Sequence, residues 1–197
     1  MKGSLETLDL TIENHIATLA INRPQARNAL NRLAYAELEQ TFIELQSNQD
    51  VRCVIITGTD PAFCSGDDVK ELMTGDASAS HSRLRAVRPT MTPAAAAILA
   101  CDRPIIAAVN GAAVGWGMDL SLLADFRIAS ERARFGELFV KRGLVSDVGG
   151  LCRLPEIVGP QKAAELLFTG ELFDGQAAVD MGLAMQVVPH DELLSEA

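Results

Sequence analysis

The stretch PIIAAVNGAAVGWGMDLSLL, residues 104–123, passes from an aliphatic run through glycine-containing turns into a leucine-rich segment. The aliphatic run at 104–109 is typical of a strand that is buried on both faces. Asn110-Gly111 predicts a turn, and Gly115-Trp-Gly117 predicts a tight bend. The leucines that follow predict a helix. These features together predict a mixed α/β fold with buried strands.

The same succession occurs earlier in the chain. The run at 51–57 predicts a second buried strand, a loop follows over 58–67, and a short helix begins near Asp68. A helix that begins after a glycine loop leaves backbone N–H groups unpaired at the positive end of its dipole, where a negative oxygen can bind. Two such helix starts that converge on one point would form an oxyanion hole. Ordinary strand–turn–helix connections, which are common in α/β proteins, are the alternative interpretation.

The remaining segments surround these two units. Alternation over 8–12 and 16–21 predicts a β-hairpin, and Leu38, Phe42 and Leu45 recur at the spacing of an amphipathic helix. The sequence further predicts a loop at 24–28, a mobile segment of small polar residues at 74–81, a helix at about 93–100, a strand at 126–129 and short elements up to 187–188.

The composition excludes several classes of protein. The 197 residues suffice for one domain, whose core is mostly aliphatic because 48% of the residues are hydrophobic and only 5% aromatic. A net charge of −9 would repel nucleic-acid phosphates. No apolar stretch approaches the ~18 residues of a membrane span, and a signal peptide is not expected. The four cysteines have no zinc-type spacing and are expected to be reduced thiols of a cytoplasmic protein.

Four segments, in this order along the chain, resemble the enoyl-CoA hydratase/isomerase (crotonase) superfamily. They are Asn22–Leu30 (NRPQARNAL), Phe63–Glu71 (FCSGDDVKE), Ala108–Leu120 (AVNGAAVGWGMDL) and Gly143–Pro155 (GLVSDVGGLCRLP). Phe168-Thr-Gly170, followed by 177–182, matches as well. One such segment would be a weak indication, whereas four in order over nearly the whole chain are a strong one.

The resemblance implies a fold and a substrate. The fold is an α/β spiral of repeated ββα units, here a domain over 1–190, with a C-terminal helix beginning over 191–197 and the rest of the C-terminal helical part short or missing. The substrate is an acyl-CoA thioester bound across the units, with no cofactor besides that coenzyme A, no metal, and no nucleic-acid or membrane partner. Members with the C-terminal helices form homotrimers or hexamers.

The resemblance also implies the two oxyanion donors, the backbone N–H groups of Asp67 and Trp116. Removing an α-proton from a thioester, or adding a nucleophile at its β-carbon, places negative charge on the carbonyl oxygen, which two fixed donors stabilise. Backbone donors do not depend on the side chain. The family usually has glycine or a small residue at the position of Trp116, so the indole is expected to reshape the acyl pocket.

The acid–base residues implied by the resemblance depart from the hydratase pattern. Hydratases of the family carry two glutamates, whose positions here hold Asp119 and Phe139, and Phe139 cannot transfer a proton. Several isomerases of the family use a position that corresponds to Asp147. We therefore expect isomerisation of a double bond, with Asp147 as the principal base and acid and Asp119 as its assistant. A hydratase and a non-catalytic acyl-CoA-binding member are the alternatives. Each aspartate also has a possible structural role: Asp147 could cap a helix, and Asp119 could interact with the dipole of its helix.

The resemblance implies that two loops of this chain contact coenzyme A. The expected residues are Arg27, Ala29, Ser65, Gly66, Val69 and Lys70. Arg27 and Lys70 would supply local positive charge, although solvated surface cations are the ordinary role of such side chains. A dinucleotide-binding fold is not expected, because Leu120 stands where the fingerprint needs its third glycine.

Overall fold

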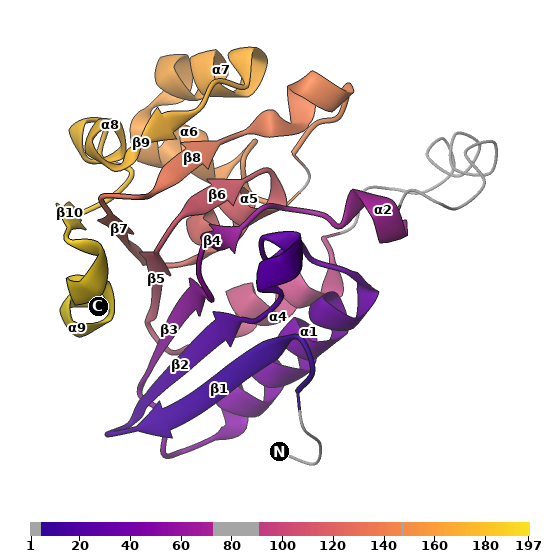
Figure 1. Cartoon of the computed structure of the whole chain (residues 1–197), viewed down its shortest axis with the longest axis vertical. Coiled ribbons are helices and arrows are strands. Elements are labelled where there is room, and N and C mark those ends of the chain that lie inside the picture. The colour runs from indigo at the N-terminus through magenta and orange to yellow at the C-terminus, as the bar shows by residue number, and fades with distance from the viewer. Residues whose placement is uncertain (1–4, 73–90, 147) are drawn as a thin grey trace.

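The computed structural model describes residues 5–72, 91–146 and 148–197, and it contains two β-sheets (Figure 1). The larger sheet has the order β1 (Leu8–Glu13), β2 (Ile16–Ile21), β3 (Cys53–Gly58), β5 (Ile105–Val109), β7 (Phe126–Ser130) and β10 (Gln186–Val188). The smaller sheet has the order β4 (Ala62–Cys64), β6 (Ala112–Val114), β8 (Arg134–Gly136) and β9 (Phe173–Asp174).

From β3 to β8, consecutive strands alternate between the two sheets. In each of the pairs β3–β4, β5–β6 and β7–β8, the first strand enters the larger sheet and the second enters the smaller one. β3, β5 and β7 are parallel neighbours, as are β4, β6 and β8. The ends at which β4 and β6 leave the smaller sheet therefore lie at one edge. This repetition confirms the expected spiral of strand-pair units and brings the loops after β4 and β6 together.

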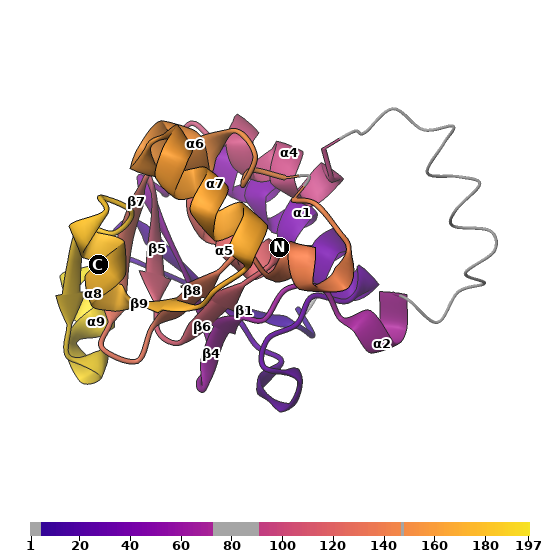
Figure 2. The same ribbon diagram turned by 90° about the horizontal axis from the view of Figure 1, so that it is seen from above.

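Helices cover both sheets. The α-helices are α1 (Arg32–Ser47), α2 (Val69–Leu72), α4 (Pro93–Ala100), α5 (Trp116–Leu123), α6 (Arg153–Val158), α7 (Pro160–Thr169), α8 (Gly175–Asp180) and α9 (Leu193–Glu196), and the 3-10 helices are η1 (Pro24–Ala26), η2 (Leu138–Arg142) and η3 (His190–Glu192). All residues of α5 are buried, because the helix packs on β4, β6, α4 and α6. Figure 2 shows α5 in the interior of the protein.

Several local predictions are confirmed. β1 and β2 form the predicted antiparallel hairpin, and Asn14 and His15 in its turn both have positive φ, which suits the twist of the two strands. Helix α1 begins after Asn31, whose side chain accepts a hydrogen bond from the Ala34 N–H at 2.9 Å. Its residues Leu38, Phe42 and Leu45 are buried, as the amphipathic spacing predicts.

The structure differs from the predictions at element ends. The strand predicted from Val51 begins at Cys53, because the Val51 N–H is engaged in a turn with the Asn48 carbonyl. The C-terminal helical segment is divided between η3 and α9. The segment at 74–81 lies outside the described residues. All four cysteines are free, and burial raises the pKa of Cys64 to about 12. No helix in the described part of the chain is both long and apolar enough to cross a membrane.

Candidate active site

The loops after β4 and β6 meet at Gly66 and Trp116. A Cβ atom built on Gly66 would lie only 3.3 Å from the Trp116 backbone nitrogen, so the two backbones are in contact. The sequence predicts that the two loops meet only if the carboxyl ends of β4 and β6 lie on the same side of one sheet. The parallel pairing of β4 with β6 supplies that condition.

The two predicted donor N–H groups take no part in the backbone hydrogen bonds that join the described loops. The carbonyl of Gly66 and the N–H of Asp68 bond to Leu30, so the N–H of Asp67 between them points away from that loop. Trp116 is the first residue of α5, where an N–H has no partner within the helix. Among the described residues, no backbone carbonyl of a loop or turn accepts from either group. Within the described residues, the two loops thus bring together two backbone N–H groups to which no loop or turn carbonyl is bonded.

Two glycines fix the second loop. Gly115 precedes α5 with φ 56° and ψ −126°, a conformation available essentially to glycine alone. At Gly117, a Cβ atom would lie 2.0 Å from the carbonyl oxygen of Cys64, at the end of β4. Only glycine therefore allows the start of α5 to pack against β4. The Gly-Trp-Gly sequence keeps the Trp116 N–H where the two loops meet.

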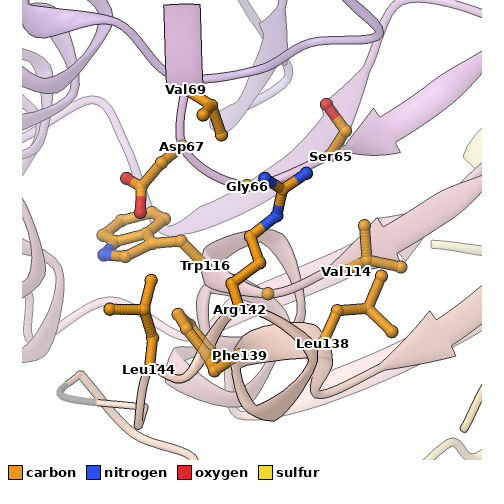
Figure 3. A pocket seen from close by; sticks show the side chains of 11 residues that line it. Ser65, Gly66, Asp67, Val69, Val114, Trp116, Leu138, Phe139, Arg142 and Leu144 are labelled. Carbon is orange, nitrogen blue, oxygen red and sulfur yellow. The ribbon is translucent and has the colours of Figure 1, made fainter. Parts of the chain in front are cut away.

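A cavity of about 130 Å³ adjoins the two donors, and we call it the inner cavity (Figure 3). It is lined by Ser65, Gly66, Asp67, Val69, Val114, Gly115, Trp116, Leu138, Phe139, Arg142 and Leu144. Most of these side chains are apolar. Arg142 is the basic one, and Figure 3 shows its guanidinium extending towards Gly66 and Ser65. Sequence reasoning missed Arg142, although it follows closely on the recognised position Phe139.

Aromatic packing holds the side chain of Trp116. The rings of Trp116 and Tyr35 meet edge to face, with centroids 5.0 Å apart and planes at 89°. The Tyr35 hydroxyl donates to Oδ1 of Asp67 at 2.5 Å. The buried Nε1 of Trp116 has no hydrogen-bond acceptor among the described residues. The indole and the Asp67 carboxylate stand on the same side of the inner cavity (Figure 3).

Asp119 lies in a buried polar cluster with Ser146 and Gly150. Its carboxylate accepts hydrogen bonds from the Ser146 hydroxyl at 2.9 Å and from the Gly150 N–H at 2.6 Å. Asp119 is completely buried and is not among the residues that line the inner cavity. The carboxylate therefore ties Ser146 to Gly150. Asp147 itself lies outside the described residues.

A second buried carboxyl, that of Glu137, belongs to the same cluster. A Cβ atom on Gly150 would lie 2.7 Å from Oε1 of Glu137 and 2.9 Å from Oδ1 of Asp119, so both carboxyls face Gly150. No described residue donates a hydrogen bond to either carboxyl oxygen of Glu137. Burial, and then the charge of Asp119, raise the pKa of Glu137 to about 9. Glu137 is therefore a neutral acid at pH 7, which sequence reasoning missed.

Phe139 lies in η2 and lines the inner cavity. Its Cζ atom would be 4.0 Å from a Cβ atom on Gly115, which places the ring against the loop of the Trp116 donor. At the position where the resemblance implies the second glutamate of hydratases, this cavity thus has an apolar wall. No proton can be transferred at this point of the wall.

The expected coenzyme A residues come from two loops joined by backbone hydrogen bonds. The Leu30 N–H donates to the Gly66 carbonyl at 2.8 Å, and the Ser65 N–H donates to the Arg27 carbonyl at 3.2 Å. Ser65, Gly66 and Val69 also line the inner cavity, whereas Ala29 is buried and Arg27 and Lys70 are exposed. Arg23, which sequence reasoning did not single out, fixes the pair of loops through an ion pair with Asp68 at 2.9 Å.

Comparison with known proteins identifies relatives of this chain. Residues 11–197 match the sequence pattern of the enoyl-CoA hydratase/isomerase family. A probable enoyl-CoA hydratase of Mycobacterium tuberculosis is 36% identical, over 98% of this chain and 72% of the relative. A peroxisomal Δ(3,5)-Δ(2,4)-dienoyl-CoA isomerase of Arabidopsis thaliana is also 36% identical, over 93% and 69%. The crystal structure of a putative enoyl-CoA hydratase/isomerase from Mycobacterium abscessus superposes with a TM-score of 0.89 at 31% identity, over 96% and 74%.

Proposed function

Because this chain belongs to the enoyl-CoA hydratase/isomerase family, we propose that it shifts a double bond in an enoyl-CoA thioester through an enolate held by the N–H groups of Asp67 and Trp116. The observation that carries the proposal is the meeting of two loops beside a mostly apolar cavity, each with a backbone N–H to which no carbonyl of a described loop or turn is bonded. No cofactor besides the coenzyme A of the substrate is needed, because the thioester itself makes the α-proton removable.

The two donors act on the charge that develops during proton removal. As the α-proton leaves, the thioester carbonyl oxygen becomes an enolate oxygen, and one fixed donor in such a site contributes about 3 kcal/mol. The apolar walls at Val114, Leu138 and Phe139 keep water away from this oxygen and strengthen both hydrogen bonds. Coenzyme A then lies along the two joined loops, and Arg142 offers it a positive charge.

We infer isomerisation rather than hydration from the acid–base residues. A double-bond shift needs one group that takes a proton from one carbon and returns it to another, and Asp147 is our candidate for that group. Asp119 assists by holding Ser146 and Gly150, which precede and follow Asp147 in the sequence. Hydration in this family uses a second glutamate to activate water, and Phe139 occupies its position. The equal identity to a hydratase and to an isomerase keeps hydration as the second candidate.

The test is the fate of matched 2-enoyl- and 3-enoyl-CoA thioesters. An isomerase converts the 3-enoyl thioester into the conjugated 2-enoyl form, which is followed by its ultraviolet absorbance. A hydratase instead consumes the 2-enoyl form and incorporates ¹⁸O from labelled water. Isomerisation that falls about 10²- to 10⁴-fold in Asp147→Asn supports the assignment of the base. Isomerisation that survives in this variant overturns that assignment, and the absence of turnover with any enoyl-CoA overturns the proposed function.

A further inference from the structure

A second, larger cavity lies next to the inner cavity, and we call it the outer cavity. Its volume is about 440 Å³, and its lining includes Tyr35 and Glu39 of α1 and Thr92, just before α4. Asp67 and Trp116 line both cavities. The same two residues that offer the oxyanion N–H groups therefore also form the partition between the cavities.

The partition is a packed set of three side chains. Trp116 is 2% exposed and its ring meets that of Tyr35 edge to face. Tyr35 in turn donates to the Asp67 carboxylate, so side chains from α1, α5 and the loop after β4 fix one another. Because the two large rings pack against each other and Tyr35 is bonded to Asp67, the Trp116 ring cannot move aside without losing these contacts.

From this arrangement we infer that the side chain of Trp116 limits the site to short acyl groups. The inference rests on the proposed function, because it takes the thioester oxygen to lie at the N–H groups of Asp67 and Trp116. Once that oxygen is in place, its distance to the partition is fixed, because donors and partition belong to the same residues. An acyl chain that extends beyond the inner cavity meets the indole, and the outer cavity behind the partition stays closed to it.

Removing the indole should open the outer cavity and leave the donors in place. Trp116→Ala keeps the backbone N–H at the start of α5 while it deletes the partition. Each methylene that then enters apolar surroundings stabilises the complex by about 0.8 kcal/mol, so two methylenes correspond to a more than tenfold gain in affinity. Trp116→Phe is the matched control, because it keeps an aromatic ring at the partition and loses only the indole N–H and part of the volume.

The experiment measures dissociation constants of saturated butanoyl-CoA and octanoyl-CoA by calorimetry, which requires no turnover. For the wild-type protein we expect butanoyl-CoA to bind at least tenfold more tightly. The ratio of the octanoyl-CoA to the butanoyl-CoA dissociation constant should fall by more than tenfold in Trp116→Ala and by less than about threefold in Trp116→Phe. Trp116→Leu replaces the alanine variant if the latter does not fold, as judged by circular dichroism.

Two outcomes overturn the inference. Equal binding of both thioesters by the wild-type protein would show that no partition limits the chain. An unchanged ratio in folded Trp116→Ala or Trp116→Leu would show that the limit lies elsewhere. In both cases isomerisation of enoyl-CoA could persist, so the proposed function would stand. If neither thioester binds, the proposed function fails, and this inference fails with it.

Discussion

The donor side of the site, at Asp67 and Trp116, and the carboxyl side, at Asp119 and Glu137, are built from different parts of the chain. On the donor side, two backbone N–H groups are aimed by loop conformations in which the side chains take no part. On the carboxyl side, two acids, a serine hydroxyl and a backbone N–H meet in the protein interior. Substitution should therefore displace the two N–H groups only where it changes backbone geometry, whereas on the carboxyl side it should act through charge and hydrogen bonding.

The largest effect is expected from a methyl group on the donor side. Gly117→Ala places Cβ 2.0 Å from the Cys64 carbonyl oxygen, so α5 must move away from β4. We expect a loss of about 3 kcal/mol or more in the free energy of unfolding, together with loss of thioester binding. Denaturant titration measures the first and calorimetry the second. Gly149→Ala is the control, because its Cβ would meet nothing closer than 3.7 Å. Equal stability of the two variants would contradict the close packing of the donor loop.

On the carboxyl side, Asp119→Ala removes the acceptor of two buried hydrogen bonds. The Ser146 hydroxyl and the Gly150 N–H both lose this partner. We expect destabilisation of about 2–3 kcal/mol, since a hydrogen bond to a charged group contributes 1.5–3 kcal/mol. Asp119→Asn, which retains one oxygen acceptor, should lose less. Unfolding free energies within 0.5 kcal/mol of wild type for Asp119→Ala would show that the cluster does not hold the turn.

Glu137 adds a pH dependence that the donor side lacks. Burial and the charge of Asp119 raise the pKa of its carboxyl to about 9, well above the ordinary range of a glutamate. An acid whose pKa is higher in the folded than in the unfolded state stabilises the fold at low pH. This contribution is lost as the pH rises through the folded-state pKa. Glu137→Gln, a neutral side chain of the same shape, should lose less stability than the wild type between pH 5 and 9.

Urea unfolding of both proteins at pH 5, 7 and 9 measures this difference. The two stability curves should converge towards pH 5 and separate at pH 9, with the variant more stable. Parallel curves over the whole range would contradict a protonated Glu137 in the folded protein.

The smallest effect is expected when only a side chain changes on the donor side. Asp67→Ala keeps the backbone N–H but removes the acceptor of the Tyr35 hydroxyl. The free energy of unfolding should fall by about 1 kcal/mol, the usual contribution of one hydrogen bond. The change in kcat/KM for enoyl-CoA should stay below tenfold, which steady-state kinetics would measure. A loss of a thousandfold would mean that the carboxylate, rather than the N–H, takes part in the reaction.

The sequence predicts the strands, loops and helix starts of the donor side because these features are local, whereas the donor role of Asp67 and Trp116 comes from the family resemblance and stays a prediction. Aliphatic strands, a glycine on each loop and the starts of the helices at Val69 and Trp116 can be recognised to within about a residue without tertiary contacts. The shared sheet edge of β4 and β6, which makes the loops meet, follows from the repeated strand pairs.

The carboxyl side was predicted only in part, because its environment comes from segments far apart in the chain. Glu137 is an ordinary acid beside a glycine in the sequence, and its burial depends on residues at 119, 146 and 150. The role of Asp119 in holding Ser146 is likewise set by a contact across 27 residues. The hydrogen bond between Tyr35 and Asp67 has no sequence pattern either, because it joins α1 to the loop after β4.

Exchange of the α-protons of butanoyl-CoA in D₂O tests enolate stabilisation most directly, because it requires neither hydration nor a double-bond shift. Proton and deuterium change places at the α-carbon through the enolate alone, and mass spectrometry follows the incorporation of label. We predict that the wild-type protein accelerates this exchange well above the rate in buffer, and that Asp147→Asn slows it. Exchange no faster with saturating protein than without it would contradict the account that the N–H groups of Asp67 and Trp116 stabilise an enolate.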